Sequence, residues 1–185
     1  MTDVLILNFD GGNQLRRAMS EVCQNRWHME PGCRVSVLTS KSANFHIEGK
    51  RMAEQVARSP IYVVADNDCL ILGENFVRLG IEIMGKHPEY GLLAATSICD
   101  GHFPSGRVYS VMEEVVPMQA GGVAFVRKGI LKEFNDCQPN QVDDSICSEM
   151  NRKGHLTGYM PGLRFNHIGS DYSISSPTNW MRVPG

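Results

Sequence analysis

Two aspartates, Asp66 and Asp68, stand one residue apart directly after the apolar run at residues 61–65. Such a run is typical of a buried strand, and ligands of open α/β sheets bind at the carboxyl ends of strands. Two carboxylates in that place can both face a hard cation, which completes its shell with phosphate oxygens. Asp66-Asn67-Asp68 therefore predicts a Mg²⁺ or Mn²⁺ site that holds the diphosphate of a nucleotide.

The alternative for this triplet is an Asx-turn that closes the strand, because Asp and Asn are favoured in turns for their local hydrogen bonds. A calcium-binding EF-hand loop is excluded by spacing. Counted from Asp66, the sixth and twelfth positions are Ile71 and Val77, where that loop needs Gly and Glu.

A second acidic pair, Asp143-Asp144, stands where a helix is expected to begin. The helix dipole and free amides keep a carboxylate ionised there, while a neighbouring carboxylate raises one of the two pKa values. One of the pair is therefore a candidate general base. The alternative is helix capping, for which Asp is also favoured.

Near the N-terminus, Asp10-Gly11 follows an apolar run and precedes another glycine. Glycine permits close approach of a backbone, so this segment is expected to contact the base and ribose of a nucleotide. An ordinary tight turn is the alternative.

Strands alternating with helices are expected to position these groups. Apolar runs predict strands at residues 4–7, 35–38, 61–65, 91–96 and 122–126. Between the first three runs, apolar residues recur at helical spacing and predict buried stripes: Leu15, Ala18, Met19, Val22 and Cys23 in one helix, and Met52, Ala53, Val56 and Ala57 in the next. This alternation indicates parallel βαβ units and a nucleotide-binding half-sheet.

The order of the motifs resembles family 2 glycosyltransferases and their GT-A relatives. The aspartate motif is followed by a glycine-containing strand ending in Arg127, the acidic pair at a helix start, then Gly154, Pro161 and His167. The resemblance covers roughly residues 2–169. It implies an α/β fold of the single-domain GT-A type, a Rossmann-like nucleotide-diphospho-sugar transferase fold with a mostly parallel central sheet flanked by helices. Residues 1–169 form this expected domain, and residues 170–185, rich in Ser and Pro, an expected flexible tail.

The resemblance also implies residue roles around the metal. Asp66 contacts the ribose or the metal, and Asp68 ligates the metal. Asp144 acts as the base, with Asp143 in place of the more usual Glu, so which of the two acts stays open. His167 ligates the metal or contacts the diphosphate; its alternative role is a strand-end histidine bonded to a backbone carbonyl.

The same resemblance places the nucleotide beside the glycines Gly121 and Gly122 and beside Arg51. These three residues, together with Asp10, Gly11, Asp66 and Asn67, are the expected nucleotide-binding residues.

The function expected from the resemblance is metal-dependent, inverting transfer of a sugar from a nucleotide-diphosphate donor to an acceptor hydroxyl. A UDP-sugar is the first choice of donor. Two alternatives stay open. One is a sugar-phosphate nucleotidyltransferase, whose glycine-rich opening is similar to residues 11–16 but has a third glycine. The other is a nucleotide-sugar-binding module without turnover. The acceptor is unidentified, and residues 98–114 occupy the place of an acceptor loop.

Composition limits the partners. The 185 residues carry a formal net charge of -2, which gives no general attraction to nucleic acid or anionic membranes. The charge therefore does not indicate a nucleic acid acceptor, although this alternative stays open. The six cysteines form no CxxC pair, which favours free thiols in a reducing compartment. The first apolar run is too short for a signal peptide or membrane span, and we expect a cytoplasmic protein.

Overall fold

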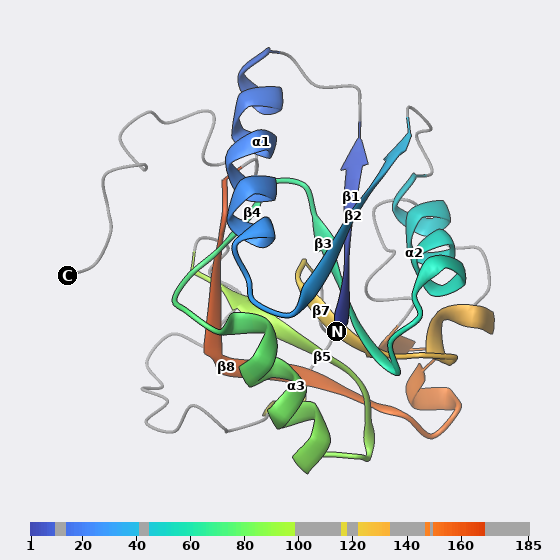
Figure 1. Cartoon of the computed structure of the whole chain (residues 1–185). Helices are drawn as coiled ribbons and strands as arrows, with labels where there is room; N and C mark the ends of the chain where they lie inside the picture. The colour runs from blue at the N-terminus through green and yellow to red at the C-terminus, as the bar shows by residue number, and fades with distance from the viewer. Residues whose placement is uncertain are drawn as a thin grey trace.

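The computed structural model of the chain describes residues 1–9, 14–40, 45–98, 116–117, 122–133, 147–148 and 150–168. Figure 1 shows strands enclosed by helices on two sides. The elements, in chain order, are β1 (Thr2–Phe9), α1 (Gln14–His28), β2 (Cys33–Ser40), α2 (Phe45–Val56), β3 (Ile61–Asp66), β4 (Cys69–Ile71), α3 (Phe76–Lys86), β5 (Tyr90–Ser97), β6 (Val116–Pro117), β7 (Ala124–Arg127), the 3₁₀ helix η1 (Ile130–Glu133) and β8 (Leu156–His167). Residues 147–148 and 150–152 are also helical.

The strands form one sheet in the order β2-β1-β3-β7-β5-β8-β4, with β6 paired to β8. Strand β1 pairs in parallel with β2 and β3, and β5 pairs in parallel with β8. Strand β7 lies antiparallel between β3 and β5, while β4 and β6 run antiparallel to β8. Five strands thus share one direction, which confirms the expected mostly parallel sheet flanked by helices.

Side chains alternate between two buried layers, as the two-residue period of a strand requires. In β1, Val4 and Ile6 face a core that includes Trp27 of α1 and Phe76 of α3. Leu5 and Leu7 face the opposite core, which contains Ala53 of α2 and Leu131 of η1. Because both faces are covered, the inner strands are continuously apolar, and this is why the sequence predicted them.

The predicted stripes of the first two helices are partly wrong. In α1, Met19, Cys23 and Trp27 are buried, whereas Ala18 and Val22 are exposed. In α2, Ala53 is buried and Met52 and Val56 are exposed, with Ala57 buried just beyond the helix end. Both helices therefore present a narrower stripe to the sheet than their apolar residues predicted.

Asp3 ties the start of β1 to the segment that precedes β3. Its carboxylate accepts hydrogen bonds from the backbone N–H groups of Arg58 and Ser59, at 2.6 and 2.8 Å, and from Arg34 Nε at 2.5 Å. Burial opposes the charge of this carboxylate, but the hydrogen bonds together hold the pKa of Asp3 below its ordinary value. Among the described residues, no helix has the length and apolar composition needed to cross a membrane.

Candidate metal and nucleotide site

The aspartate motif lies in the turn that joins β3 to β4. Asp66 is the last residue of β3, Asn67 and Asp68 form the turn, and Cys69 begins β4. The turn is held from two sides, since Asn67 N–H donates to Leu7 O at 3.1 Å and Ile168 N–H donates to Asp68 O at 2.9 Å. The side chains of the motif therefore start from a backbone that is fixed by β1 and β8.

Strand β8 brings His167 to this turn. Strands β4 and β8 pair antiparallel with His167 directly opposite Cys69. Directly opposed residues of such a pair have Cβ atoms about 4.5–5.5 Å apart on one face of the sheet. His167 Nε2 lies 3.1 Å from Asp68 Oδ1. Cys69 and His167, more than half of the 185-residue chain apart in sequence, are thus neighbours through strand pairing.

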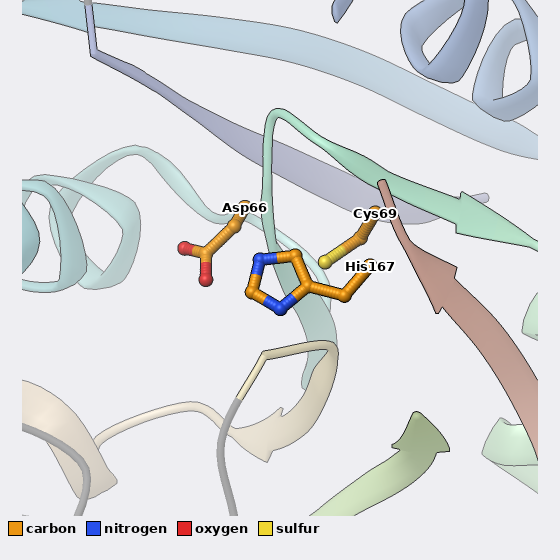
Figure 2. Close-up of side chains that lie close together, drawn as sticks. All are labelled: Asp66, Cys69 and His167. Carbon is orange, nitrogen blue, oxygen red and sulfur yellow. The ribbon is translucent and has the colours of Figure 1, made fainter. Parts of the chain in front are cut away.

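Four side chains, which we call the donor cluster, gather here: Asp66, Asp68, Cys69 and His167. One ligand atom each of Asp66, Cys69 and His167 lies within 4.8 Å of the others. In Figure 2 the imidazole of His167 lies between the Asp66 carboxylate and the Cys69 sulfur. The side chains of His167 and Asp68 are 25% and 26% exposed, whereas Cys69 is completely buried. The cluster is open to solvent on its carboxylate and imidazole side, with the thiol beneath.

The charge state of the thiol follows from its surroundings. Burial, and then the carboxylates of Asp66 and Asp68, raise the pKa of Cys69 well above its ordinary value. Burial and the Asp68 carboxylate likewise raise the pKa of Cys23 to about 12. Without a cation nearby, both groups are neutral thiols, and the carboxylates are the oxygen donors suited to a hard cation.

This donor chemistry fits the predicted Mg²⁺ or Mn²⁺. Two carboxylates with partial solvent access leave positions for phosphate oxygens and water, as these cations require. Asp66, Asp68 and His167, the three metal ligands named from the sequence, lie together in the donor cluster. Their role as metal ligands remains a prediction.

A polar network extends the site along the ends of the neighbouring strands. Asn67 Nδ2 donates to Asn8 Oδ1 at 2.7 Å, and Asn8 Nδ2 donates to Thr39 Oγ1 at 3.3 Å. Ser20 of α1 also donates to Asn8 Oδ1, at 3.5 Å. These residues join the carboxyl ends of β1, β2 and β3, where open α/β sheets bind ligands. Asn8 was not among the predicted site residues, although its place directly after an apolar run was a usable signal.

Gly122, one of the predicted nucleotide-binding residues, lies at the same edge. Strand β7 begins at Ala124, opposite Val64 near the carboxyl end of β3, and Gly122 lies two residues before this start. Gly122 has φ +77° and packs on Phe165 so closely that a Cβ would lie 2.7 Å from Phe165 Cζ. Glycine is therefore required here by both backbone conformation and space.

Arg51 lies in α2 and is half-buried, on the helix that covers the face of the sheet containing Leu7 and Val64. The remaining predicted site residues fall outside the described residues: Asp10, Gly11, Gly121, Asp143 and Asp144. So do residues 99–114 of the expected acceptor loop and the expected tail at 170–185.

No protein-family model matches the chain, and no curated protein matches it in sequence. Solved structures do match in fold. TarS 1–349 of S. aureus, in complex with UDP-GlcNAc, gives a TM-score of 0.56 at 12% identity, covering 93% of this chain and 62% of TarS 1–349. The chain thus spans about three-fifths of that structure. TarS 1–349 has also been solved in complex with UDP.

Two further structures match over most of their length. UDP-glucose pyrophosphorylase of Acinetobacter baumannii gives a TM-score of 0.57 at 11% identity, covering 94% of this chain and 74% of the enzyme. CMP:2-keto-3-deoxy-manno-octonic acid synthetase, in complex with CTP, gives 0.55 at 10% identity, covering 87% of this chain and 90% of the synthetase. At such identities the likeness concerns the fold. The chain has the nucleotide-diphospho-sugar transferase fold that the order of its sequence motifs implied.

Proposed function

We propose that this chain is a metal-dependent glycosyltransferase that moves a sugar from a UDP-type donor to an acceptor hydroxyl with inversion. The observation that carries the proposal is the position of His167 beside two carboxylates at the carboxyl end of β3: a ligand atom of His167 lies within 4.8 Å of one of Asp66, and His167 Nε2 lies 3.1 Å from Asp68 Oδ1. The fold supports a nucleotide sugar as the ligand, and TarS, solved with UDP and UDP-GlcNAc, supports the choice of UDP.

In this proposal, Asp68 and His167 hold Mn²⁺ or Mg²⁺, with Asp66 as a further ligand or a ribose contact. The bound cation neutralises charge on the departing diphosphate. Asn67 and Asn8 fix the turn that carries Asp68, so the ligands keep their geometry while the sugar is transferred. Gly122 lets the nucleotide approach the backbone just before β7.

The proposed base is Asp144 or its neighbour Asp143, which takes the proton of the acceptor hydroxyl as its oxygen attacks the anomeric carbon. The oxygen-to-carbon bond forms as the carbon-to-diphosphate bond breaks, and a single displacement of this kind inverts the configuration. Replacement of Asp144 by Asn separates catalysis from binding. Lost transfer with unchanged UDP affinity supports a base, whereas unchanged donor turnover contradicts this role.

Calorimetry of UDP binding tests the metal site. We expect UDP to bind in the presence of Mn²⁺ and to lose at least about tenfold in affinity with chelator, because even outer-shell changes at metal sites cost 10–100-fold. Asp68→Asn should reproduce the chelator effect. Glu82→Gln is the matched control, since Glu82 is an exposed carboxylate of α3 paired with Arg78. Equal affinity with and without the cation would overturn the metal assignment.

A sugar-phosphate nucleotidyltransferase is the second candidate, favoured by fold matches of equal strength to the pyrophosphorylase and the CTP-bound synthetase. Such an enzyme joins a nucleoside triphosphate to a sugar phosphate and releases pyrophosphate. Incubation with nucleoside triphosphates and a panel of sugar phosphates distinguishes the two. Pyrophosphate release there, with no sugar transfer or hydrolysis from UDP-sugars, would replace the first proposal by the second.

A further inference from the structure

A thiol lies among the oxygen and nitrogen donors of the cluster. The Cys69 sulfur is within 4.8 Å of ligand atoms of both Asp66 and His167. A buried cysteine often serves only as a small apolar residue. Cys23 and Cys147 are buried cysteines too, but neither belongs to this group of converging donors.

Thiol, imidazole and carboxylate are the three ligand types that zinc uses in proteins, whereas Mg²⁺ takes oxygen ligands. Bond lengths of about 2.0 Å to nitrogen and 2.3 Å to sulfur separate the ligands of tetrahedral zinc by roughly 3.3–3.7 Å. A separation of up to 4.8 Å in the cluster closes to this range by shifts of about 1 Å. The side chains of Asp66 and His167 are only partly buried and can make such shifts by rotation, while Cys69 stays on the fixed strand.

We infer that the donor cluster has a second ligand set, Asp66, Cys69 and His167, which binds a thiophilic divalent cation such as Zn²⁺, with Asp68 or water in the fourth position. The Cys69 thiol loses its proton to solvent as the sulfur-to-zinc bond forms. The inference uses the metal site of the proposed function but does not depend on sugar transfer. Because His167 serves both sets, Zn²⁺ excludes Mn²⁺ and acts as an inhibitor of Mn²⁺-dependent nucleotide binding.

Cys69 is the ligand that distinguishes this second set from the Mn²⁺ set, and its position is fixed by the fold. Antiparallel pairing fixes Cys69 opposite His167, and the turn of Asn67 and Asp68 fixes it three residues after Asp66. Serine at this position keeps the volume and removes the soft ligand. Cys69→Ser therefore separates the two ligand sets, since the oxygen and imidazole donors for Mn²⁺ remain.

Titration with Co²⁺, without nucleotide, tests the inference. We expect visible bands of tetrahedral cobalt together with a sulfur-to-cobalt charge-transfer band in the near ultraviolet, all removed by added Zn²⁺. Cys69→Ser should lose the charge-transfer band and at least about tenfold in affinity. Cys23→Ala, which removes a neighbouring buried thiol outside the ligand set, should keep both. A band that survives in Cys69→Ser, or that is missing in the unmodified chain, would overturn the inference.

Two further measurements keep the inference testable if Cys69→Ser fails to fold. Zn²⁺ added in weak buffer should release about one proton more from the unmodified chain than from Cys69→Ser. Asp66→Asn keeps the thiol, so it should retain the charge-transfer band and weaken Co²⁺ binding; unchanged Co²⁺ affinity would contradict the ligand set. A charge-transfer band without Mn²⁺-dependent UDP binding would contradict the proposed function and leave this inference standing. Mn²⁺-dependent UDP binding without the charge-transfer band would contradict this inference and leave the proposed function standing.

Discussion

Replacement of Gly122 by Ala tests whether the close packing at the end of β7 supports the donor cluster. An alanine in the left-handed conformation of Gly122 costs about 1–2 kcal/mol. Its Cβ would also lie 2.7 Å from Phe165 Cζ, an overlap with a buried ring that costs about 1–3 kcal/mol. We therefore expect Gly122→Ala to lower the free energy of unfolding by about 2–5 kcal/mol.

Gly154→Ala is the matched control. Gly154 has φ +83°, and a Cβ there would meet no atom within 4 Å. This variant therefore has the conformational cost alone, about 1–2 kcal/mol. Both substitutions restrict the unfolded chain equally, so that effect cancels in the comparison. The remaining difference, about 1–3 kcal/mol, measures the contact with Phe165.

Urea denaturation measures the free energy of unfolding of both variants. In scanning calorimetry, a difference of 1 kcal/mol shifts the melting temperature of a chain of this size by about 2–4 °C. We therefore expect Gly122→Ala to melt roughly 2–12 °C below Gly154→Ala. Phe165 and His167 have ring centroids 6.3 Å apart on one strand. A displaced Phe165 ring should therefore also weaken Mn²⁺-dependent UDP binding, in Gly122→Ala only. Equal losses of stability in the two variants would refute the packing argument.

Three other outcomes are expected. Asp3→Asn should cost about 1.5–3 kcal/mol at neutral pH. Because the folded-state pKa of Asp3 is lowered, its stabilisation is present above the ordinary value of 3.8 and lost as the pH falls through the folded-state pKa, so the variant should show a flatter decline in acid denaturation. His167→Ala should weaken Mn²⁺-dependent UDP binding more than Mg²⁺-dependent binding, because imidazole is a softer ligand than oxygen; an unchanged ratio in calorimetry, with a lower melting temperature, would assign His167 a packing role. Thiol titration of the denatured chain without reductant should find all six cysteines, and a lower count would contradict free thiols.

The strands could be predicted because they are buried on both faces, so their apolar runs are unbroken. Strand β4 could not, since its three residues are too few to show a period. The prediction of the metal site included Asp66 and Asp68 because only one residue separates them in the sequence. It missed Cys69 as a possible ligand because only pairing with β8 brings His167 to it.

The helix stripes were partly wrong because close packing on a sheet depends on partners that a local pattern does not contain. In α2, Glu54 is buried, although a stripe defined by apolar residues alone would leave a glutamate on the exposed side of the helix. Its carboxylate accepts hydrogen bonds from Tyr62 OH at 2.7 Å and from the backbone N–H of Gly129 at 2.6 Å. A buried carboxylate is tolerated when its oxygens are paired in this way. Since Gly129 lies 75 residues further along the chain, helical periodicity could not predict this burial.

The irregular pairing of β8 determines which of its side chains reach the donor cluster. Along β5 the partner changes from Met160, opposite Ala95, to Arg164, opposite Thr96, so β8 advances four residues while β5 advances one. The three extra residues are an odd number, and an odd shift reverses the face on which every later side chain lies. Met160 and Phe165 consequently belong to the same buried core despite their odd separation. His167, two residues beyond Phe165, is thereby placed on the face of Cys69; with regular pairing it would face away. The bulge is therefore a requirement of the site, in keeping with the enrichment of bulges beside active sites.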